Sequence, residues 1–250
     1  MRRMGAVVRE VGFAPVKGTR HLALDHVDLD ELGARGDRAF CLVDEERRRV
    51  LRTVQHPSLM GIVVRTYDDG LALTLPDGER ADGPATASGE TITCDYWGRQ
   101  VDLQLTEGPH AELISIQLRR DVRLARAPRG GVVFGDPVTV VTTASLDALG
   151  ADAARFRPTL VLETDEPWLE DSWLGRELEV GDAVIRVGGP VPRCAVIDHH
   201  PESGAKDARL LMALVGTRPT NRAGEPMFGV YATVTRTGRV TVTRLSLIHI

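Results

Sequence analysis

The residue best suited to chemistry in this chain is Cys194. It directly follows Arg193, at the end of a segment whose two prolines predict a turn. A thiolate is a soft, strongly donating ligand, and it suits a transition metal or sulfur chemistry. A neighbouring guanidinium lowers the cost of forming the thiolate and can hold an anionic partner. The alternative is that Cys194 is a small buried apolar residue, as free cysteines commonly are. The local residues alone leave both interpretations open.

Other motifs along the chain place charged or polar residues beside glycine or proline, where turns display side chains. Each motif is weak by itself, because a lysine or arginine at a turn is normally just solvated. Their order carries more information than any one of them. They lie at residues 15–18, 36–38, 53–57, 143–145, 155–158, 171–175 and 226–231.

Taken together and in this order, the motifs resemble the MOSC family, named for the C-terminal domain of molybdenum cofactor sulfurases. The resemblance is closest to two-part members with an N-terminal MOSC-type β-barrel, a group that includes the mitochondrial amidoxime-reducing component. It runs from about Val7 to Val242, and its most specific parts are residues 155–158, 192–194 and 228–231.

The resemblance implies a site for the molybdenum cofactor, Mo-molybdopterin. It implies that Cys194, after Pro192, ligates molybdenum or, in sulfurase-type members, accepts a persulfide. It assigns the pterin phosphate to Arg157, and it implies that Lys17 and Arg38 are basic residues that the N-terminal part brings to the same cofactor. The chemistry of the residues agrees, since a dianionic phosphate needs several cations and the dithiolene of the pterin leaves room for a further sulfur ligand. The family is also associated with pyridoxal phosphate binding.

Three more positions belong to the site that the resemblance implies. Gly18 accompanies Lys17, Ser145 is expected to place a hydroxyl against the phosphate or pterin, and Tyr231 is expected to line the pocket floor. The chain also departs from the family pattern. Thr159 stands where asparagine usually follows Arg-Pro, and Val54 stands where a basic residue often precedes Gln-His-Pro. These departures put one polar contact and some substrate contacts in doubt.

The function implied is the reduction of N-hydroxylated or N-oxide compounds by oxygen removal, with Cys194 as the catalytic residue. Three cysteines are too few for the usual iron–sulfur cluster, and no flavin or nicotinamide fingerprint is evident. Electrons are therefore expected from a separate donor protein of ferredoxin, flavin or haem type. The alternatives are a sulfur carrier with a Cys194 persulfide and a cofactor-binding module without turnover.

Composition excludes some broad classes of function. The chain has 250 residues and a net charge of −4, and such a charge argues against a general nucleic-acid binder. No apolar run approaches the roughly 20 residues needed to span a bilayer, so no membrane association is expected. The odd cysteine count and the absence of a secretory signal favour a reducing cytoplasm.

The spacing of turns predicts the fold class. Many short β-rich runs with few helices indicate a mainly β, α+β protein with closed or curled antiparallel sheets. We expect an N-terminal barrel-like domain at 1–108, a connecting helix or linker at 109–126, a MOSC β-barrel with a few short helices at 127–244 and an atypical tail at 245–250.

Local patterns predict individual elements. Alternation between apolar and polar residues, bounded by turn residues, indicates hairpins, and 3.6-residue spacing indicates helices. We expect hairpins at 59–75, 39–54, 91–105, 178–187 and 228–242, strands at 138–141 and 158–163, a long loop at 76–89, and helices at 110–119, 143–149 and 207–215.

Several residues that could do chemistry have simpler interpretations. His199 and His200 are adjacent, so their side chains diverge in an extended segment, and a loop is expected. Cys41 and Cys94 lie in strand-like runs and are expected to be buried and structural. His56 before Pro57 either stabilises a turn or acts as an acid or base near the pocket.

Overall fold

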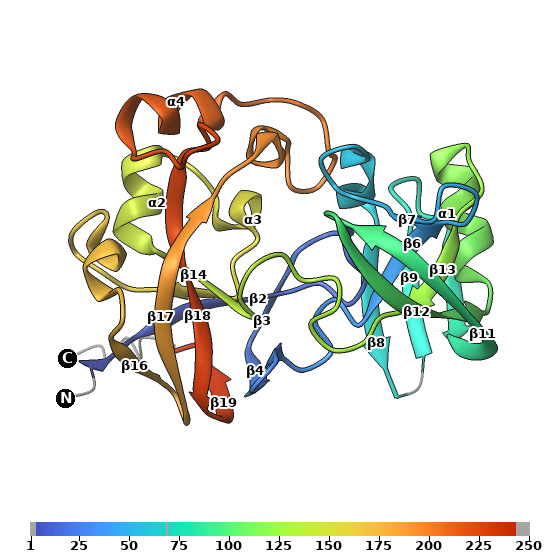
Figure 1. Cartoon of the computed structure of the whole chain (residues 1–250), viewed down its shortest axis with the longest axis horizontal. Helices are drawn as coiled ribbons and strands as arrows, with labels where there is room; N and C mark the ends of the chain where they lie inside the picture. The colour runs from blue at the N-terminus through green and yellow to red at the C-terminus, as the bar shows by residue number, and fades with distance from the viewer. Residues whose placement is uncertain (1–3, 69, 244–250) are drawn as a thin grey trace, which may run out of the picture.

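The computed structural model describes residues 4–68 and 70–243, and it is mainly β with four short α-helices among those residues, as predicted. Figure 1 shows two lobes side by side. We call residues 39–126 the barrel lobe and residues 4–38 with 127–243 the sheet lobe. Between them lies the site described below.

The barrel lobe is built on a closed five-stranded barrel. Its strand β12 shows why: Val101, Leu103 and Leu105 are buried while the residues between them are exposed, so one face of the strand points inward. A three-stranded sheet and two helical segments complete the lobe. The barrel strands are β6 (Phe40–Asp44), β7 (Arg49–Val50), β11 (Thr86–Tyr96), β12 (Arg99–Glu107) and β13 (Arg123–Arg126); the sheet strands are β8 (Val63–Tyr67), β9 (Gly70–Thr74) and β10 (Arg80–Pro84); the helical segments are η1 (Pro57–Gly61) and α1 (His110–Leu118).

The sheet lobe centres on an eight-stranded sheet in the order β1-β16-β17-β18-β14-β15-β2-β3, beside a small sheet in the order β19-β4-β5. Its strands are β1 (Met4–Gly5), β2 (Val8–Phe13), β3 (Leu22–Leu24), β4 (His26–Asp30), β5 (Gly33–Ala34), β14 (Val138–Thr142), β15 (Leu160–Leu162), β16 (Glu177–Val180), β17 (Ala183–Pro192), β18 (Met227–Arg236) and β19 (Gly238–Thr241). Its helical segments are α2 (Thr143–Leu149), α3 (Ala153–Phe156), η2 (Leu169–Trp173), η3 (Ala195–Asp198) and α4 (Leu210–Thr217).

Strand pairing groups the chain differently from the expected division at 108 and 126. The first strands join the sheet lobe, because β2 pairs with β15 and β4 pairs with β19. Conversely, β13 pairs with β6 and β12, so the segment expected as a linker closes the barrel. The apolar side chains of β2 and β4 bury against partners more than 100 residues away in sequence, and local spacing does not reveal such pairing.

Two of the three predicted helices form at the expected positions, whereas α4 covers Leu210–Thr217 instead of 207–215 and α3 was not predicted. Helix α1 occupies most of the expected 110–119 segment, and α2 ends at Gly150 in the left-handed conformation (φ 58°) that favours glycine. The hairpins β8–β9, β6–β7, β11–β12 and β16–β17 pair antiparallel as expected.

Two predictions of local structure were wrong. The expected loop at 76–89 contains β10, an edge strand whose Gly and Pro content disguised it. The expected hairpin at 228–242 does not form, because β19 pairs with β4 and not with β18. Thr237 alone separates these strands, which is too short a connection to reverse the chain.

The tail at 245–250 lies outside the described residues. Cys41 and Cys94 are buried, as predicted. Within residues 4–68 and 70–243, none of the helices has the length and apolar character needed to cross a membrane.

Candidate functional site

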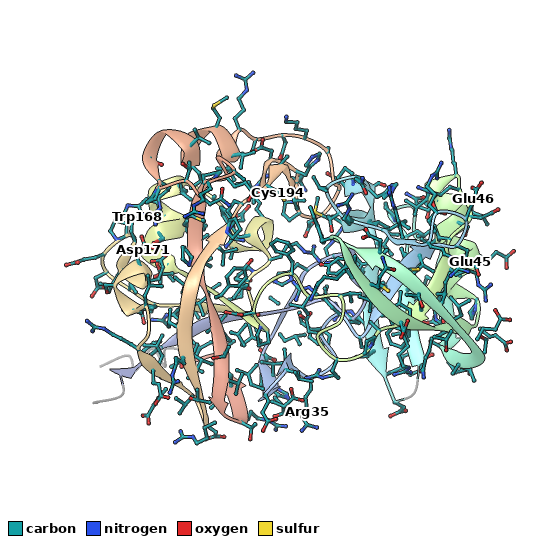
Figure 2. The ribbon with its side chains drawn as sticks, in the orientation of Figure 1. Arg35, Glu45, Glu46, Trp168, Asp171 and Cys194 are labelled. Atoms are coloured by element: carbon teal, nitrogen blue, oxygen red, sulfur yellow. The ribbon has the colours of Figure 1, made fainter. Side chains whose placement is uncertain are left out.

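A cavity of about 220 Å³ opens between the two lobes. Residues of the barrel lobe, such as Arg52 and Tyr96, line one side, and residues of the sheet lobe line the other. Figure 2 shows Cys194 in this region between the lobes. The structure brings seven of the eight predicted site residues to this interlobe cavity: Lys17, Gly18, Arg38, Arg157, Pro192, Cys194 and Tyr231.

Lys17 and Gly18 reach the cavity from the loop between β2 and β3. The backbone N–H of Lys17 donates to the carbonyl of Phe40 at 2.8 Å, which docks the loop on the barrel lobe. The Lys17 ammonium lies 4.8 Å from the centre of the Tyr96 ring. Gly18 has φ 91°, and a Cβ there would lie 3.3 Å from Thr53 Oγ1. This close approach and the left-handed backbone account for glycine beside the lysine.

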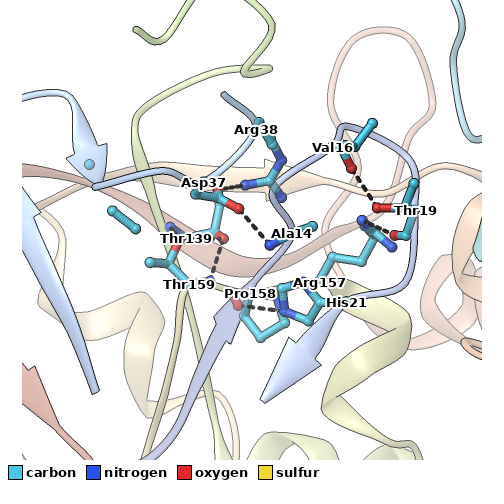
Figure 3. A network of polar contacts seen from close by, with 12 residues as sticks. Ala14, Val16, Thr19, His21, Asp37, Arg38, Thr139, Arg157, Pro158 and Thr159 are labelled. Carbon is cyan, nitrogen blue, oxygen red and sulfur yellow. Dashed lines mark hydrogen bonds and ion pairs between the residues drawn. The ribbon is translucent and has the colours of Figure 1, made fainter. Parts of the chain in front are cut away.

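Arg38 follows a turn that is tied to β2, as Figure 3 shows. The backbone N–H of Arg38 donates to the carbonyl of Ala14 at 2.8 Å, and the Asp37 carboxylate accepts from the backbone N–H of Ala14 at 2.8 Å. The same carboxylate pairs with the Arg38 guanidinium. Arg38 is left-handed, with φ 49°. The turn therefore fixes both the backbone and the head group of this arginine.

Arg157 terminates α3 and reaches back across the sheet lobe. Its Nη2 donates to the carbonyl of Thr19 at 2.7 Å, and its backbone is left-handed, with φ 53°. Seven described non-glycine residues have positive φ, and Arg38, Trp97 and Arg157 are the three of them that line the cavity. Such backbone conformations cost about 1–3 kcal/mol each and gather at functional sites.

These cations strongly perturb one another. Burial, together with Arg38 and Arg157, lowers the pKa of Lys17 to about 7. Burial and then Arg38 lower the pKa of Arg157 to about 9. Asp37 is the one carboxylate that pairs with this group among the residues described. The end of the cavity formed by Lys17, Arg38 and Arg157, which we call the cation end, thus has excess positive charge and favours an anion.

The effect of this charge extends to His21, which lies behind the cation end. Its Nε2 is 3.0 Å from the carbonyl of Pro158 (Figure 3). Burial, Arg157 and Arg38 hold the pKa of His21 well below its ordinary value, so the ring is neutral and accommodates the cations.

Cys194 lines the same cavity from a different segment of the chain. It follows Pro192, the last residue of β17, and its thiol is exposed at the start of η3, where it makes no capping hydrogen bond. The backbone N–H of Arg193 donates to the carbonyl of Pro226 at 2.9 Å, which anchors the turn to the start of β18. We call this region, with Cys194 and Tyr231, the sulfur end.

Arg193 itself points into the core. Its Nε donates to the carbonyl of Phe228 at 2.8 Å and its Nη1 to that of Phe156 at 3.0 Å. Its guanidinium lies 5.2 Å from the centre of the Phe156 ring and 5.6 Å from that of Phe228. Burial lowers the pKa of Arg193 to about 10. The Arg193 guanidinium, which the sequence suggested would lie beside the Cys194 thiol, is therefore a buried charge in the core. The Nη2 atom of Arg193 has no partner among the described residues.

Tyr231 lines the cavity from β18, as expected. Gly135 makes room for its ring, since a Cβ at residue 135 would lie 2.4 Å from the Tyr231 Cζ. Burial raises the pKa of Tyr231, while Arg193 opposes the rise and Asp136 adds to it. The phenol is thus a neutral hydrogen-bonding group.

Ser145 does not line the cavity. Its Oγ donates to Glu170 Oε2 at 2.8 Å and accepts from the backbone N–H of Trp168 at 2.7 Å, and its side chain is fully buried. The Ser145 hydroxyl is thus held by Trp168 and Glu170, at the start of η2. The structure separates Ser145 from the residues with which it was grouped.

Arg155 and Thr159, each two positions from Arg157, make hydrogen bonds that hold the fold together. Arg155 makes two hydrogen bonds to Asp207, both 2.9 Å long, although it also borders the cavity. Thr159 exchanges hydrogen bonds with Thr139, each backbone N–H donating to the other hydroxyl at 3.1 Å (Figure 3). The hydroxyl at 159 therefore fastens β15 to β14.

The cavity also contains residues that sequence reasoning missed. They include Asp136 and Glu225 near Tyr231, and Trp97 and Phe134, two exposed aromatic residues. The one sequence signal was Trp97-Gly98, a turn dipeptide between two predicted strands. His199 lies in a loop with Nδ1 2.8 Å from the carbonyl of Gly204, as expected for a structural histidine.

The residues present fit a phosphate-bearing, soft-metal cofactor better than a bare ion. Within residues 4–68 and 70–243, no group of three or more His, Cys, Asp or Glu side chains could hold a metal ion. A single exposed thiol with three cations suits a group that brings its own ligands and an anionic tail.

Comparisons with known proteins find relatives among the molybdenum cofactor sulfurases. A molybdenum cofactor sulfurase of Caenorhabditis elegans is 25% identical over 87% of this chain and 32% of its own length. That of Oryza sativa subsp. japonica is 36% identical over 33% of this chain and 10% of its own. The chain thus spans about a third or less of the curated relatives it matches.

A solution structure of a Bordetella bronchiseptica protein aligns with 50% of this chain and 95% of its own, at 15% identity and a TM-score of 0.32, a likeness too weak to carry an argument. The family models divide the chain in two. The MOSC N-terminal beta barrel domain matches residues 5–120, and the MOSC domain matches residues 129–244. This chain therefore belongs to the MOSC family, with the two-part architecture of an N-terminal barrel domain followed by a MOSC domain.

Proposed function

We propose that the interlobe cavity binds the molybdenum cofactor and that the protein reduces N-hydroxylated or N-oxide compounds. The observation that carries the proposal is the pairing of two features in one cavity: an excess of cations and an exposed thiol. The family relationship to molybdenum cofactor sulfurases supports a cofactor of this kind.

At the cation end, Lys17, Arg38 and Arg157 would hold the phosphate. Arg38 and Arg157 present planar guanidinium groups fixed through their backbones, so little order is lost when an anion binds. Lys17 is a compact charge that gains its proton most readily when an anion is close. Gly18 leaves the space in which the loop can approach the barrel lobe.

At the sulfur end, Cys194 would provide the thiolate ligand and Pro192 would fix the turn that presents it. When bound, the cofactor supplies metal-centred two-electron redox chemistry. Tyr231, whose phenol stays protonated because of burial, is placed to hydrogen-bond an oxygen atom of the substrate. These residues orient the reacting group and hold protons near it.

The overall reaction requires a source of electrons and protons. Removing the oxygen of a hydroxylamine as water consumes two electrons and two protons and leaves the amine. Three cysteines, of which Cys41 and Cys94 are buried, cannot hold the usual cluster. We therefore assign the electrons to a separate donor protein of ferredoxin, flavin or haem type, and we place the protein in the cytoplasm on its cysteine usage.

The test is to express the chain in a host that makes molybdopterin and to measure molybdenum and pterin per chain. We expect close to one of each. Reduced viologen should then support turnover of a hydroxylamine or amidoxime, and NADH alone should not. Metal-loaded protein that stays inert with strong donors across such substrates would rule out the reductase assignment.

The exposure of Cys194 favours one alternative, a sulfur carrier. In that case the Cys194 thiolate would take the outer sulfur of a donor persulfide, leaving the donor as a thiol and Cys194 as a persulfide. The curated relatives are named as sulfurases, which is consistent with sulfur chemistry. Trapping a Cys194 persulfide in protein that lacks reductase turnover would favour the carrier.

A further inference from the structure

Two aromatic side chains at the interlobe cavity have no role in the cofactor site proposed above. Trp97 belongs to the barrel lobe and Phe134 to the sheet lobe, and both line the cavity. Their ring centres are 5.4 Å apart and their planes are inclined by 57°. They are 44% and 49% exposed, so a large apolar area faces solvent at the cavity.

Trp97 occupies a position that its backbone does not favour. It forms, with Gly98, the two-residue turn between β11 and β12, and both residues have positive φ, 55° and 78°. Turns of this kind favour Asn, Asp or Gly at the first central position. A bulky residue there costs stability, and its ring is not buried in a core that would offset that cost. The position is better explained by binding than by folding.

Neighbouring arginines hold the two rings in place. The Arg52 guanidinium lies 4.4 Å from the centre of the Trp97 ring, and its Nε donates to Gln55 Oε1 at 3.2 Å. Arg99 donates from Nη2 to the carbonyl of Val133 at 2.7 Å, which ties the segment carrying Phe134 to the β11–β12 hairpin. The pair is therefore preorganised across the two lobes.

We propose that Trp97 and Phe134 form a subsite for a flat aromatic ring, so that the preferred substrates carry their N-hydroxylated nitrogen on an aromatic group. The Arg52 guanidinium lies against the Trp97 ring and brings positive charge to the subsite, so the ring that binds is neutral or anionic. The substrate class rests on the proposed reductase function, whereas the subsite itself does not.

The test compares two ligands of equal size that differ in flatness. Phenylhydroxylamine and cyclohexylhydroxylamine are assayed with reduced viologen on cofactor-loaded protein. Acetanilide and N-cyclohexylacetamide, which cannot be reduced in this way, are titrated by calorimetry into the same protein. An aromatic pair contributes about 0.5–1.5 kcal/mol, so we expect the wild type to favour the phenyl compounds by about 2- to 12-fold in KM and in Kd.

Variants separate binding from folding. Trp97→Asn fits the turn and should melt no lower than the wild type, yet lose the preference for the phenyl compounds. Trp97→Phe and the wild type should both retain it. Tyr67→Leu, which removes an aromatic residue that is 45% exposed outside the cavity, should leave the preference unchanged.

The outcomes distinguish the two proposals. Equal affinity for flat and puckered ligands in the wild type, or an unchanged preference in Trp97→Asn, would overturn the subsite. Loss of pterin from Trp97→Asn would also overturn it, because the rings would then serve the cofactor. If acetanilide binds wild type better than Trp97→Asn while no hydroxylamine is reduced, the subsite stands and the reductase function fails.

Discussion

The cation end and the sulfur end of the interlobe cavity are held by different means. At the cation end, Arg38 and Arg157 are fixed by backbone hydrogen bonds and left-handed conformations, and Lys17 is docked through its own N–H. At the sulfur end, Cys194 is exposed at the start of a four-residue helical turn with no capping hydrogen bond. Charge recognition is thus preorganised, whereas the thiol keeps its bonding capacity for an incoming group.

The largest effect should come from the sulfur end. Replacing Cys194→Ser exchanges a soft thiolate for a hard hydroxyl, which matches molybdenum poorly. Mutation of a residue that only supports a metal ligand lowers metal affinity or activity by about 10- to 100-fold. Loss of the ligand itself should therefore lower turnover at least about 100-fold. Bound molybdenum and viologen oxidation report the change. Cys94→Ala, which removes a buried thiol, should lower the melting temperature and keep the metal. Full metal and full turnover in Cys194→Ser would disprove the ligand assignment.

The cation end should show the next largest effect. A hydrogen bond to a charged group contributes about 1.5–3 kcal/mol, so Arg38→Ala and Arg157→Ala should each weaken cofactor retention by about 10- to 150-fold. Arg157→Gly is the sharper variant, because glycine accepts φ 53° without strain. Pterin content after dialysis measures retention.

Arg155 supplies the control for the cation end. Arg155→Ala breaks the pair with Asp207, so it should lower the melting temperature while pterin content stays unchanged. Unchanged pterin in both Arg38→Ala and Arg157→Ala would place the phosphate elsewhere.

A smaller, pH-dependent effect should come from Lys17. Its pKa of about 7 in the anion-free protein means that it loses its charge as the pH rises above 7. Affinity for sulfate, which remains dianionic, should therefore fall about tenfold per pH unit above that point. Calorimetry of sulfate binding measures this slope, and Lys17→Met should abolish it. A wild-type affinity that stays constant between pH 6 and 9 would contradict the assignment.

The stability of the folded protein should rise with pH, whereas the affinity for sulfate falls. The folded pKa of Lys17 lies below the ordinary value of 10.5, so the unfolded chain binds more protons between these two values. The anion-free protein should gain stability as the pH rises from about 7 towards 10.5. Below pH 7 Lys17 is charged in the folded protein, and the full destabilisation caused by burying this charge should be present. Urea unfolding across this range measures the gain.

The smallest effect on the cavity is expected for Ser145. Ser145→Ala removes a hydroxyl that bonds to the buried Glu170, which should cost about 1–3 kcal/mol of stability. Pterin content should stay at the wild-type level, because Ser145 lies outside the cavity. A selective loss of pterin with normal stability would return Ser145 to the phosphate site.

Sequence reasoning succeeded where the signal was local. The fold class, the helix ended by Gly150 and the β11–β12 hairpin all rest on residues close together in sequence. The clustering of Lys17, Arg38 and Arg157 in one cavity followed from the family resemblance, since no local pattern links positions so far apart.

Sequence reasoning failed where a strand pairs with a distant segment or where the surrounding residues determine how a side chain is oriented. The pairing of β19 with β4 depends on the tertiary arrangement of the sheet lobe. Arg193 turns inward because two backbone carbonyls and two aromatic rings receive it, and the sequence neighbour Cys194 does not reveal this. Trp97 is a bulky residue where a turn favours small polar ones, so propensity alone could not indicate a binding role.

The pairing of the first strands with the last ones has a consequence for biosynthesis. The Arg239–Asp28 ion pair joins residues 211 positions apart, so β4 obtains its partner β19 only after Thr241 has been made. The barrel strands, whose hairpins are local, can form while translation continues. The emerging N-terminal segment can form its local pairs, β2 with β3 and β4 with β5, but β2 and β4 must wait for their distant partners β15 and β19. The cavity wall is complete only after Arg157 and Cys194 have joined the N-terminal cations, so cofactor insertion follows synthesis of this part of the chain.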